Sequence, residues 1–324
     1  MTDRIICMNS VKINTTGFLH TSIRTAGHNH HHVEEKGRHN YKQKNRILPD
    51  IIVSMTHIAI ITVVYKNYSI LEDFLQSLKI QTNKNFHLFV ADASPERKEI
   101  AAEGFDLTVI PIENKGYAHG INMGLKKAQE MGIEQFCVIN DDVFFKEDFV
   151  ETLEHTLAEH PKTVFGGKIY YAPGYEFHKG RYEQEDAGKV IWYAGGTVDW
   201  AHATTGHRGV DEVDKGQYNS TESTEFITGC LCCFDKSVID TIGYWDEQYF
   251  LYYEDADFCE RVKRNNIPLF YVPELNIWHK NAQSTDGSGS ELHQKLQKKA
   301  HLRFSNKFAP FRTKLHVLKN YYLS

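Results

Sequence analysis

Between residues 58 and 159, short apolar runs alternate with segments whose apolar residues recur at helical spacing. The runs are rich in β-branched residues, as buried strands are. This alternation limits the chain to an α/β fold, because parallel strands need crossover connections, which are usually helical and right-handed. The predicted strands are 58–65, 86–91, 107–111 and 135–139, and the predicted helices are 68–80, 116–131 and 148–159.

The second half of the sequence is less regular, because two long polar segments that contain glycine interrupt it, at 173–189 and 200–220. Loops of this length inside a compact domain are usually functional. The whole pattern predicts a mostly parallel central sheet flanked by helices. The remaining predicted strands are 164–171, 190–198, 226–234 and 269–272, with a turn at Pro273-Glu274, and the remaining helices are 236–242 and 255–265.

Both ends of the chain differ from its middle. Residues 1–54 hold a histidine tract and a polar basic stretch without periodicity, which predicts disorder or a non-native extension. Residues 55–291 contain 21 Lys and Arg against 38 Asp and Glu, whereas residues 292–324 contain 8 Lys and Arg and no acid. This basic tail is expected either to rest on an anionic membrane surface or to form a solvated helix face that steers phosphates.

Composition excludes several classes of protein. No run of 18 apolar residues is present, so no membrane-spanning helix is expected. The six cysteines do not form two separated C-x-x-C pairs, which argues against a zinc ribbon and favours reduced, buried thiols. We expect a cytoplasmic protein without a nucleic-acid partner, with peripheral contact at the inner face of the cell membrane through the tail as an open alternative.

Three oxygen-bearing side chains, Asn140, Asp141 and Asp142, directly follow the apolar run 135–139. Ligands of open α/β sheets collect at the carboxyl ends of strands, and carboxylate and carbonyl oxygens suit Mg²⁺ or Mn²⁺. The triplet therefore predicts a site for a metal and a phosphate. The alternative is a turn rich in Asn and Asp that binds nothing.

A second acidic cluster begins with Glu254 and Asp255 at the start of a predicted helix, and His279 follows later. Two separated acidic clusters and a late histidine favour catalysis. The structural alternative is that Glu254 and Asp255 stabilise the positive end of the helix dipole, while Asp257 pairs with Arg261 at i,i+4.

Further candidates would bind a nucleotide. Asp92 ends the second predicted strand, where a carboxylate can accept hydrogen bonds from a base imide or a ribose hydroxyl, and Tyr65 would wall the same pocket. The alternative for Asp92 is an Asx turn leading to Ser94. Lys115 and Gly116 open a predicted helix, where free N–H groups, the helix dipole and a glycine suit a phosphate. The alternative there is an ordinary loop.

These features together resemble the glycosyltransferase family 2 enzymes of the GT-A fold, and among them the bacterial rhamnosyltransferase-like branch. The resemblance covers roughly residues 57–280. It implies one GT-A domain over 55–290, with a nucleotide-binding half at 55–145 and an acceptor-binding half at 146–290, before a basic helical tail at 291–324. The five matching segments are 63–67, 90–94, 114–124, 140–142 and 228–257.

The resemblance also implies roles for single residues. Asp255 is the implied catalytic base, with Glu254 sharing the contact to the acceptor. Asn140 stands where the family has its first acid, so one negative charge is missing and the donor phosphates are expected to complete the metal coordination. The implied donor-binding residues are Tyr65, Asp92, Lys115, Gly116, Asn140 and Asp141, and the implied ligands of Mn²⁺ or Mg²⁺ are Asp142, His279 and Asn140.

The function implied by the resemblance is inverting, metal-dependent glycosyl transfer. A UDP- or dTDP-sugar, with dTDP-rhamnose as one candidate, would donate to a saccharide or a lipid-linked saccharide in cell-surface polysaccharide synthesis. One alternative is a nucleotide-sugar or carbohydrate-binding protein with weakened catalysis, to which Asn140 points. Another is a sugar nucleotidyltransferase, which is disfavoured because the turn at 65–68 is not a glycine-rich basic loop.

Overall fold

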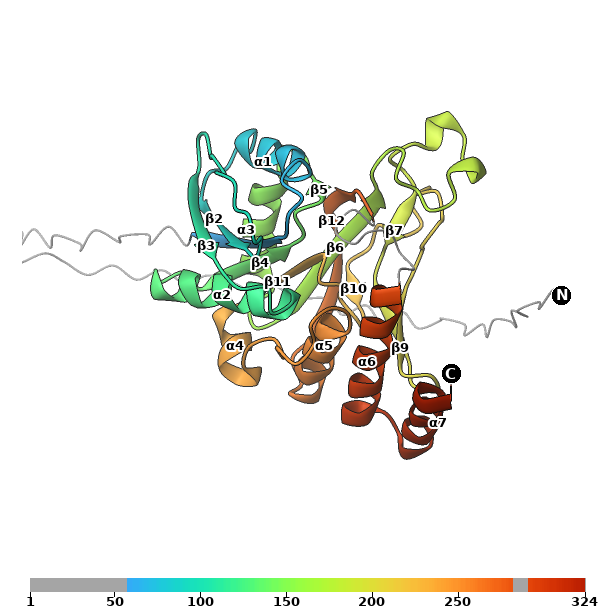
Figure 1. Ribbon diagram of the computed structural model, residues 1–324. Coiled ribbons are helices and arrows are strands. Elements are labelled where there is room, and N and C mark those ends of the chain that lie inside the picture. Colours follow the sequence, from blue (N-terminus) through green and yellow to red (C-terminus); the bar gives the residue numbers. More distant parts are fainter. Residues whose placement is uncertain (1–56, 282–290, 324) are drawn as a thin grey trace, which may run out of the picture. The chain divides into compact units, whose positions relative to one another are not determined.

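The computed structural model describes residues 57–281 and 291–323 (Figure 1). The chain divides into two units, Met1–Ile52 and Val53–Ser324, and the first lies outside the described residues. The extension predicted at 1–54 therefore also lies outside them.

The first half of this unit forms the predicted parallel arrangement. Strands β4, β1, β2 and β3 lie side by side in that order, and each adjacent pair is parallel. Figure 1 shows α1 and α3 above these strands and α2 below them. The elements are β1 (Ile58–Val64), α1 (Leu71–Lys79), β2 (Phe86–Asp92), β3 (Asp106–Pro111), α2 (Tyr117–Glu130), β4 (Gln135–Ile139) and α3 (Phe149–Glu159).

The second half extends the same sheet with mixed directions, in the order β10-β12-β6-β11-β4. Strand β11 runs antiparallel to both β4 and β6, whereas β12 and β6 are parallel. The α/β sheet flanked by helices is therefore confirmed, with its parallel character strongest in the first half. The strands are β5 (Val143–Phe144), β6 (Val164–Tyr171), β7 (Ile191–Tyr193), β10 (Glu222–Ser223), β11 (Leu231–Asp235) and β12 (Leu269–His279), beside a separate hairpin of β8 (Gly196–Asp199) and β9 (Thr204–His207).

Three predicted elements differ most from the structure. The strand predicted at 226–234 begins only at Leu231, because the residues before it form a turn in which the Leu231 N–H donates to the Thr228 carbonyl at 3.2 Å. The strand predicted at 190–198 is divided between β7 and β8. The turn predicted at Pro273-Glu274 lies inside β12, where the pairing with β6 shifts between Val272 and Asn276. A proline is tolerated in a strand at such an irregularity.

The helical C-terminal tail is confirmed. Helices α4 (Lys236–Ile242) and α5 (Glu254–Arg264) precede β12, and α6 (Glu291–Phe308) and α7 (Phe311–Leu323) follow it. Phe304 of α6 packs on Trp200, with ring centroids 5.8 Å apart, and on Tyr253, at 5.3 Å. Among the described residues, no helix combines the length and the hydropathy that a membrane span requires.

Candidate active site

The carboxyl ends of β1, β2 and β4 lie at one edge of the sheet. Val64, at the end of β1, pairs with Asp92, and Ile61 pairs with Val138, so the segment after β4 lies beside the end of β1. Neighbouring strands are about 4.8 Å apart, which places Asp92 roughly 10 Å from the 140–142 triplet, two strands away. The predicted donor-side residues therefore share one edge.

Asp142 and His279 are brought together by the pairing of β5 with β12. His279 lies opposite Val143, and the N–H of Lys280 donates to the carbonyl of Asp142 at 2.8 Å. As a result His279 Nε2 lies 3.1 Å from Asp142 Oδ1, with both side chains buried. The edge of the His279 ring packs on Trp192, with centroids 4.5 Å apart. The two residues predicted to hold a metal ion thus face each other.

This pair fits a divalent cation that shares its coordination with a substrate. Two adjacent ligands of an octahedral ion, each at about 2.1 Å, are about 3 Å apart, which matches the separation of Asp142 and His279. Within residues 57–281 and 291–323, no group of three His, Cys, Asp or Glu side chains is placed to hold a metal. Mg²⁺ and similar ions commonly take one or two protein ligands and complete their shell with substrate phosphates and water. Two protein ligands are therefore sufficient for a donor-delivered ion.

Asp141 is buried next to the negative charge of Asp142. Burial raises the pKa of its carboxyl well above the ordinary range, and the negative charge of Asp142 raises it further. A cation at Asp142 would counteract this rise in pKa, because an opposite charge favours the ionised form. The electrostatics of the triplet therefore favour the binding of positive charge.

The second acidic pair opens α5 at a turn with unusual backbone geometry. Tyr252 and Tyr253, the two residues before Glu254, have φ angles of 71° and 65°. Left-handed conformations of bulky residues are strained and are commonly found at functional sites. Tyr253 stacks on His301 of α6, with centroids 5.5 Å apart, as well as on Phe304. Helix α6 thereby supports the turn that delivers Glu254 and Asp255.

Asp255 is oriented by the turn before β11. Its carboxylate accepts the N–H of Gly229 at 3.0 Å and the N–H of Ala256 at 2.8 Å. Burial raises the pKa of Asp255, and these backbone donors oppose that rise. Burial and the neighbouring Asp255 charge raise the pKa of Glu254 to about 8. Glu254 Oε2 is buried without a hydrogen-bond partner among the described residues.

The two acidic clusters, remote in sequence, converge around Cys230 and Tyr117. Burial raises the pKa of the Cys230 thiol, and the charges of Asp142, Asp141 and Asp255 raise it further. Burial likewise raises the pKa of Tyr117. The charges of four neighbours raise it further: Cys230, Glu254, Asp141 and Asp255. Since one thiol and one phenol are affected by both clusters, the triplet and the acidic pair lie near the same two side chains.

Tyr117 connects the two acidic clusters directly. Its hydroxyl lies 3.0 Å from Asn140 Oδ1 and 3.1 Å from the carbonyl oxygen of Gly229, whose N–H holds Asp255. Tyr117 is the first residue of α2, and sequence reasoning did not single it out. The available signal was its position directly after Gly116, inside one of the matching segments.

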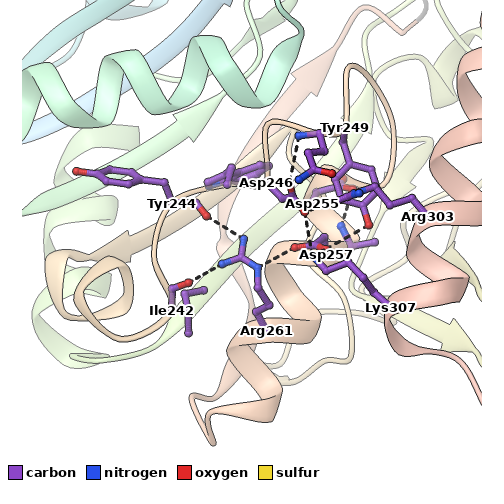
Figure 2. Close-up of polar contacts among 12 residues, drawn as sticks. Ile242, Tyr244, Asp246, Tyr249, Asp255, Asp257, Arg261, Arg303 and Lys307 are labelled. Atoms are coloured by element: carbon purple, nitrogen blue, oxygen red, sulfur yellow. Dashed lines mark hydrogen bonds and ion pairs between the residues drawn. The ribbon is translucent and has the colours of Figure 1, made fainter.

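The structural alternatives for the acidic helix are also partly observed. Asp257 is fully buried and accepts from Arg261 Nε at 2.7 Å, as the i,i+4 spacing predicts. It also pairs with Lys307 of α6 and accepts from the Tyr249 hydroxyl at 3.2 Å (Figure 2). Arg261 further donates to the carbonyl of Ile242. Asp257 is thus a structural partner of α6, while Asp255, two residues earlier, faces the site.

Two cations of the basic tail form ion pairs within this network. Arg303 donates to Asp246 at 2.7 Å, and Lys307 lies 2.9 Å from the same carboxylate (Figure 2). Burial alone would raise the pKa of Asp246, but these two cations lower it to about 2. Arg303 and Lys307 are therefore paired within the domain, and membrane contact through the tail stays a prediction.

The residues predicted to bind the nucleotide, Asp92 and Tyr65, contact other side chains and backbone groups of the protein. Asp92 is buried, and its two oxygens accept from the Ser94 N–H at 3.0 Å and the Tyr68 hydroxyl at 2.7 Å. The Asx turn that was the alternative for Asp92 is therefore present. Tyr65 is 41% exposed and carries the Lys66 ammonium 4.9 Å from its ring centroid. Base recognition by Asp92 and Tyr65 stays a prediction.

Lys115 and Gly116 have structural explanations. Lys115 Nζ lies 2.9 Å from Glu113 at an exposed position. Gly116 has a φ of 103°, and a Cβ added there would collide with the backbone of Phe250. The Phe250 carbonyl also accepts the N–H of Tyr117 at 2.9 Å. The close approach that Gly116 permits here is to Phe250, and its predicted contact with a phosphate stays a prediction.

Fold and site together define an α/β protein with a buried acidic centre at the carboxyl edge of its sheet. Comparison with known proteins is consistent with this class. The model of the family described as glycosyl transferase family 2 matches residues 59–243, which is more than half of the chain. The chain belongs to that family.

Curated relatives are similar at low identity. The chain is 21% identical over 240 residues to N-acetylglucosaminyl-diphospho-decaprenol L-rhamnosyltransferase of Mycobacterium tuberculosis, covering 70% of this chain and 76% of that protein. It is 22% identical over 172 residues to dTDP-rhamnosyl transferase RfbF of Shigella flexneri, covering 51% and 49%. The chain spans about half the length of RfbF and of a further curated relative.

A solved structure shares the fold. The crystal structure of GalNAc-T7 with UDP, GalNAc and Mn²⁺ matches with a TM-score of 0.54 at 12% identity, over 78% of this chain and 48% of that protein. This likeness confirms the GT-A fold implied by the sequence resemblance.

Proposed function

We propose that this protein transfers a sugar from a nucleotide-diphosphate donor to a hydroxyl group of a saccharide or lipid-linked saccharide. One observation carries the proposal: the Tyr117 hydroxyl lies between Asn140, which belongs to the same triplet as Asp142, and the Gly229 carbonyl, while the Gly229 N–H holds Asp255. This arrangement separates a site for the diphosphate from a carboxylate that can accept a proton. A single displacement needs both.

Asp255 is the proposed base. It takes the proton of the acceptor hydroxyl while that oxygen forms a bond to the anomeric carbon, and the bond from this carbon to the diphosphate breaks with its electron pair on the departing oxygen. Attack from the face opposite the leaving group inverts the anomeric centre. The pKa of Asp255, raised by burial, makes it a stronger proton acceptor than an exposed aspartate. Glu254 is proposed to contact the acceptor.

Asp142 and His279 are the proposed ligands of a divalent cation, with Asn140 close to them on the donor side. When bound, the ion offsets the negative charge on the departing diphosphate. An imidazole ligand favours Mn²⁺ over Mg²⁺. Asn140 Oδ1 already accepts a hydrogen bond from the Tyr117 hydroxyl. Asn140 is therefore proposed to position Tyr117 and to coordinate the ion less strongly than Asp142 and His279 do.

The donor is proposed to be a UDP- or dTDP-sugar, with dTDP-rhamnose first in the order of testing. The names of the two relatives support this choice, since one is a dTDP-rhamnosyl transferase and the other uses a diphospho-decaprenol-linked sugar. The residues proposed on the donor side are Asp92, Asp141, Tyr65, Lys115 and Gly116. A cytoplasmic protein in cell-surface polysaccharide synthesis, with a lipid-linked acceptor, is the corresponding biological setting.

The test is a donor panel scored by thermal shift with Mn²⁺, with Mg²⁺ and with chelator. A ligand that binds only the folded state raises the melting temperature by mass action. We expect one UDP- or dTDP-sugar to stabilise the protein only when the cation is present, and release of the nucleoside diphosphate on addition of acceptor. Donor binding without release in any acceptor extract would favour the binding-protein alternative.

A further inference from the structure

Helix α7 exposes a continuous apolar stripe. Phe311, Leu315, Leu318 and Tyr322 recur at intervals of four, three and four residues, which places them on one face of a helix. They are 74%, 51%, 39% and 74% exposed. The opposite face carries the buried Thr313, whose hydroxyl donates to the Trp200 carbonyl at 2.8 Å. The packing of α7 on the domain therefore turns the stripe outward.

Cations flank the stripe on both sides. At 100° per residue, Arg312 and Lys319 lie along one margin of the stripe and Lys314 along the other. Arg312 and Lys319 are exposed, and no acidic residue occurs from 292 to 324. An apolar face with Phe and Leu between basic margins is the pattern of helices that lie in a membrane interface.

We propose that α7 binds the surface of an anionic lipid bilayer, with this stripe inserted between the lipid headgroups. Phe311, Leu315, Leu318 and Tyr322 enter the interface, and Arg312, Lys314 and Lys319 contact lipid phosphates. The inference rests on the proposed function for its purpose, because a lipid-linked acceptor lies in the same membrane. It assigns membrane contact to α7, since Arg303 and Lys307 of α6 are already paired with Asp246 and Asp257.

Charge argues against two other occupants of the stripe. Two copies of the chain joined along α7 would place Arg312, Lys314 and Lys319 of both copies at one seam, where like charges repel. Residues 1–54 carry eight Lys and Arg against four Asp and Glu, so their net charge has the same sign as the margins of the stripe. An anionic surface is the complementary partner.

Docking through α7 would also orient the domain. Thr313 contacts the backbone of Trp200, which lies between β8 and β9 in the segment 200–220 that the sequence predicts to be functional. Trp200 in turn packs on Phe304, which also contacts Tyr253 at the start of the catalytic turn. Membrane contact at α7 is thus connected by direct packing to the proposed acceptor side.

The test is flotation of the full chain with vesicles of phosphatidylcholine alone and of phosphatidylcholine mixed with phosphatidylglycerol. We expect binding to the mixed vesicles that weakens with added salt. Leu315→Gln with Leu318→Gln should lower the partition coefficient at least about tenfold, because it removes apolar insertion, and Arg312→Gln with Lys319→Gln should lower binding to the mixed vesicles only. Ile80→Gln with Met131→Gln, at other exposed apolar positions, is the matched control and should change nothing.

Each remaining outcome overturns the proposal. If the Leu315 and Leu318 variant binds vesicles as well as the unchanged protein does, the membrane contact lies in another segment. If the unchanged protein does not bind vesicles, α7 makes no membrane contact. A dimer in analytical ultracentrifugation that the same variant converts to monomers would assign the stripe to a second copy. Vesicle binding is measured without donor or acceptor, so a negative result here leaves the donor thermal shift unaffected, and the reverse also holds.

Discussion

His279 Nε2 and Asp142 Oδ1 approach to 3.1 Å although one residue ends β12 and the other follows β4. The approach depends on the pairing of β12 with β5, a strand of only two residues directly after Asp142. Both side chains are buried, so neither is free to reach a cation elsewhere. The pair is therefore fixed in place by the strand pairing, as the proposed cation site requires.

His279→Ala should weaken the metal response without loss of the fold. Removing one of two protein ligands is expected to raise the Mn²⁺ concentration for half-maximal turnover by at least about tenfold. Turnover measured against Mn²⁺ concentration checks this, with thermal unfolding as the control for folding. His160→Ala, in a loop remote from the triplet, is a matched histidine substitution. An unchanged Mn²⁺ dependence would remove His279 from the coordination shell.

Asp255→Asn should abolish transfer while donor binding persists. The amide keeps the size of the side chain but cannot take the proton of the acceptor, so turnover should fall by about 10²–10⁴-fold. Asp240→Asn, at an exposed carboxylate of α4, is the control and should retain full activity. The measurement is nucleoside diphosphate release together with the donor-induced thermal shift. Retained turnover in Asp255→Asn would end the assignment of this residue as the base.

Tyr117→Phe tests the connection between the two acidic clusters. The change removes only the hydroxyl that lies between Asn140 and Gly229, so the loss of one hydrogen bond should lower kcat by about tenfold and stability by about 1 kcal/mol. Tyr244→Phe removes a comparable hydroxyl, bonded to Gln129 outside the site, and should lower stability alone. Equal kcat values for the two variants would reduce Tyr117 to a packing residue.

The raised pKa of Glu254 predicts that the stability of the protein depends on pH. Its pKa, raised from 4.5 to about 8, means that the folded protein keeps a proton that the unfolded chain releases between these values. The free energy of unfolding should therefore fall as the pH rises through this window, by at most about 1.4 kcal/mol per pH unit. Urea unfolding at several pH values measures this slope, which Glu254→Gln should reduce. An identical slope in the variant would show that Glu254 ionises freely in the fold.

The first half of the fold was predictable because its signals are local. The strands before Tyr65, Asp92 and Asn140 are apolar runs between helices of clear periodicity, and parallel pairing places their carboxyl ends together. The same reasoning identified both acidic clusters. Whether Asp92 and Tyr65 read a base was not decided by the fold, because the Asx turn explains Asp92 equally well.

The parts that sequence reasoning missed depend on contacts between remote segments. Pro273 suggested a turn, whereas β12 continues through a register shift to His279. The contact of Gly116 with Phe250, far along the chain, could not be read from the local motif. The role of the Tyr117 hydroxyl depends on Asn140 and Gly229 meeting at one point. Periodicity and local motifs carry no information about contacts between residues that are remote in sequence.

Lys307→Met tests the anchoring of α6 to α5, the helix that begins with Glu254 and Asp255. Lys307 contacts both Asp246 and the fully buried Asp257, so its removal leaves a buried carboxylate with one cation fewer. We expect a loss of roughly 1–3 kcal/mol in the free energy of unfolding. Lys299→Met, at an exposed position on the same helix, is the matched control and should lie within about 0.5 kcal/mol of the unchanged protein. Because α6 also packs on Tyr253, turnover of Lys307→Met should fall together with stability. Full stability in this variant would show that Arg261 alone neutralises Asp257.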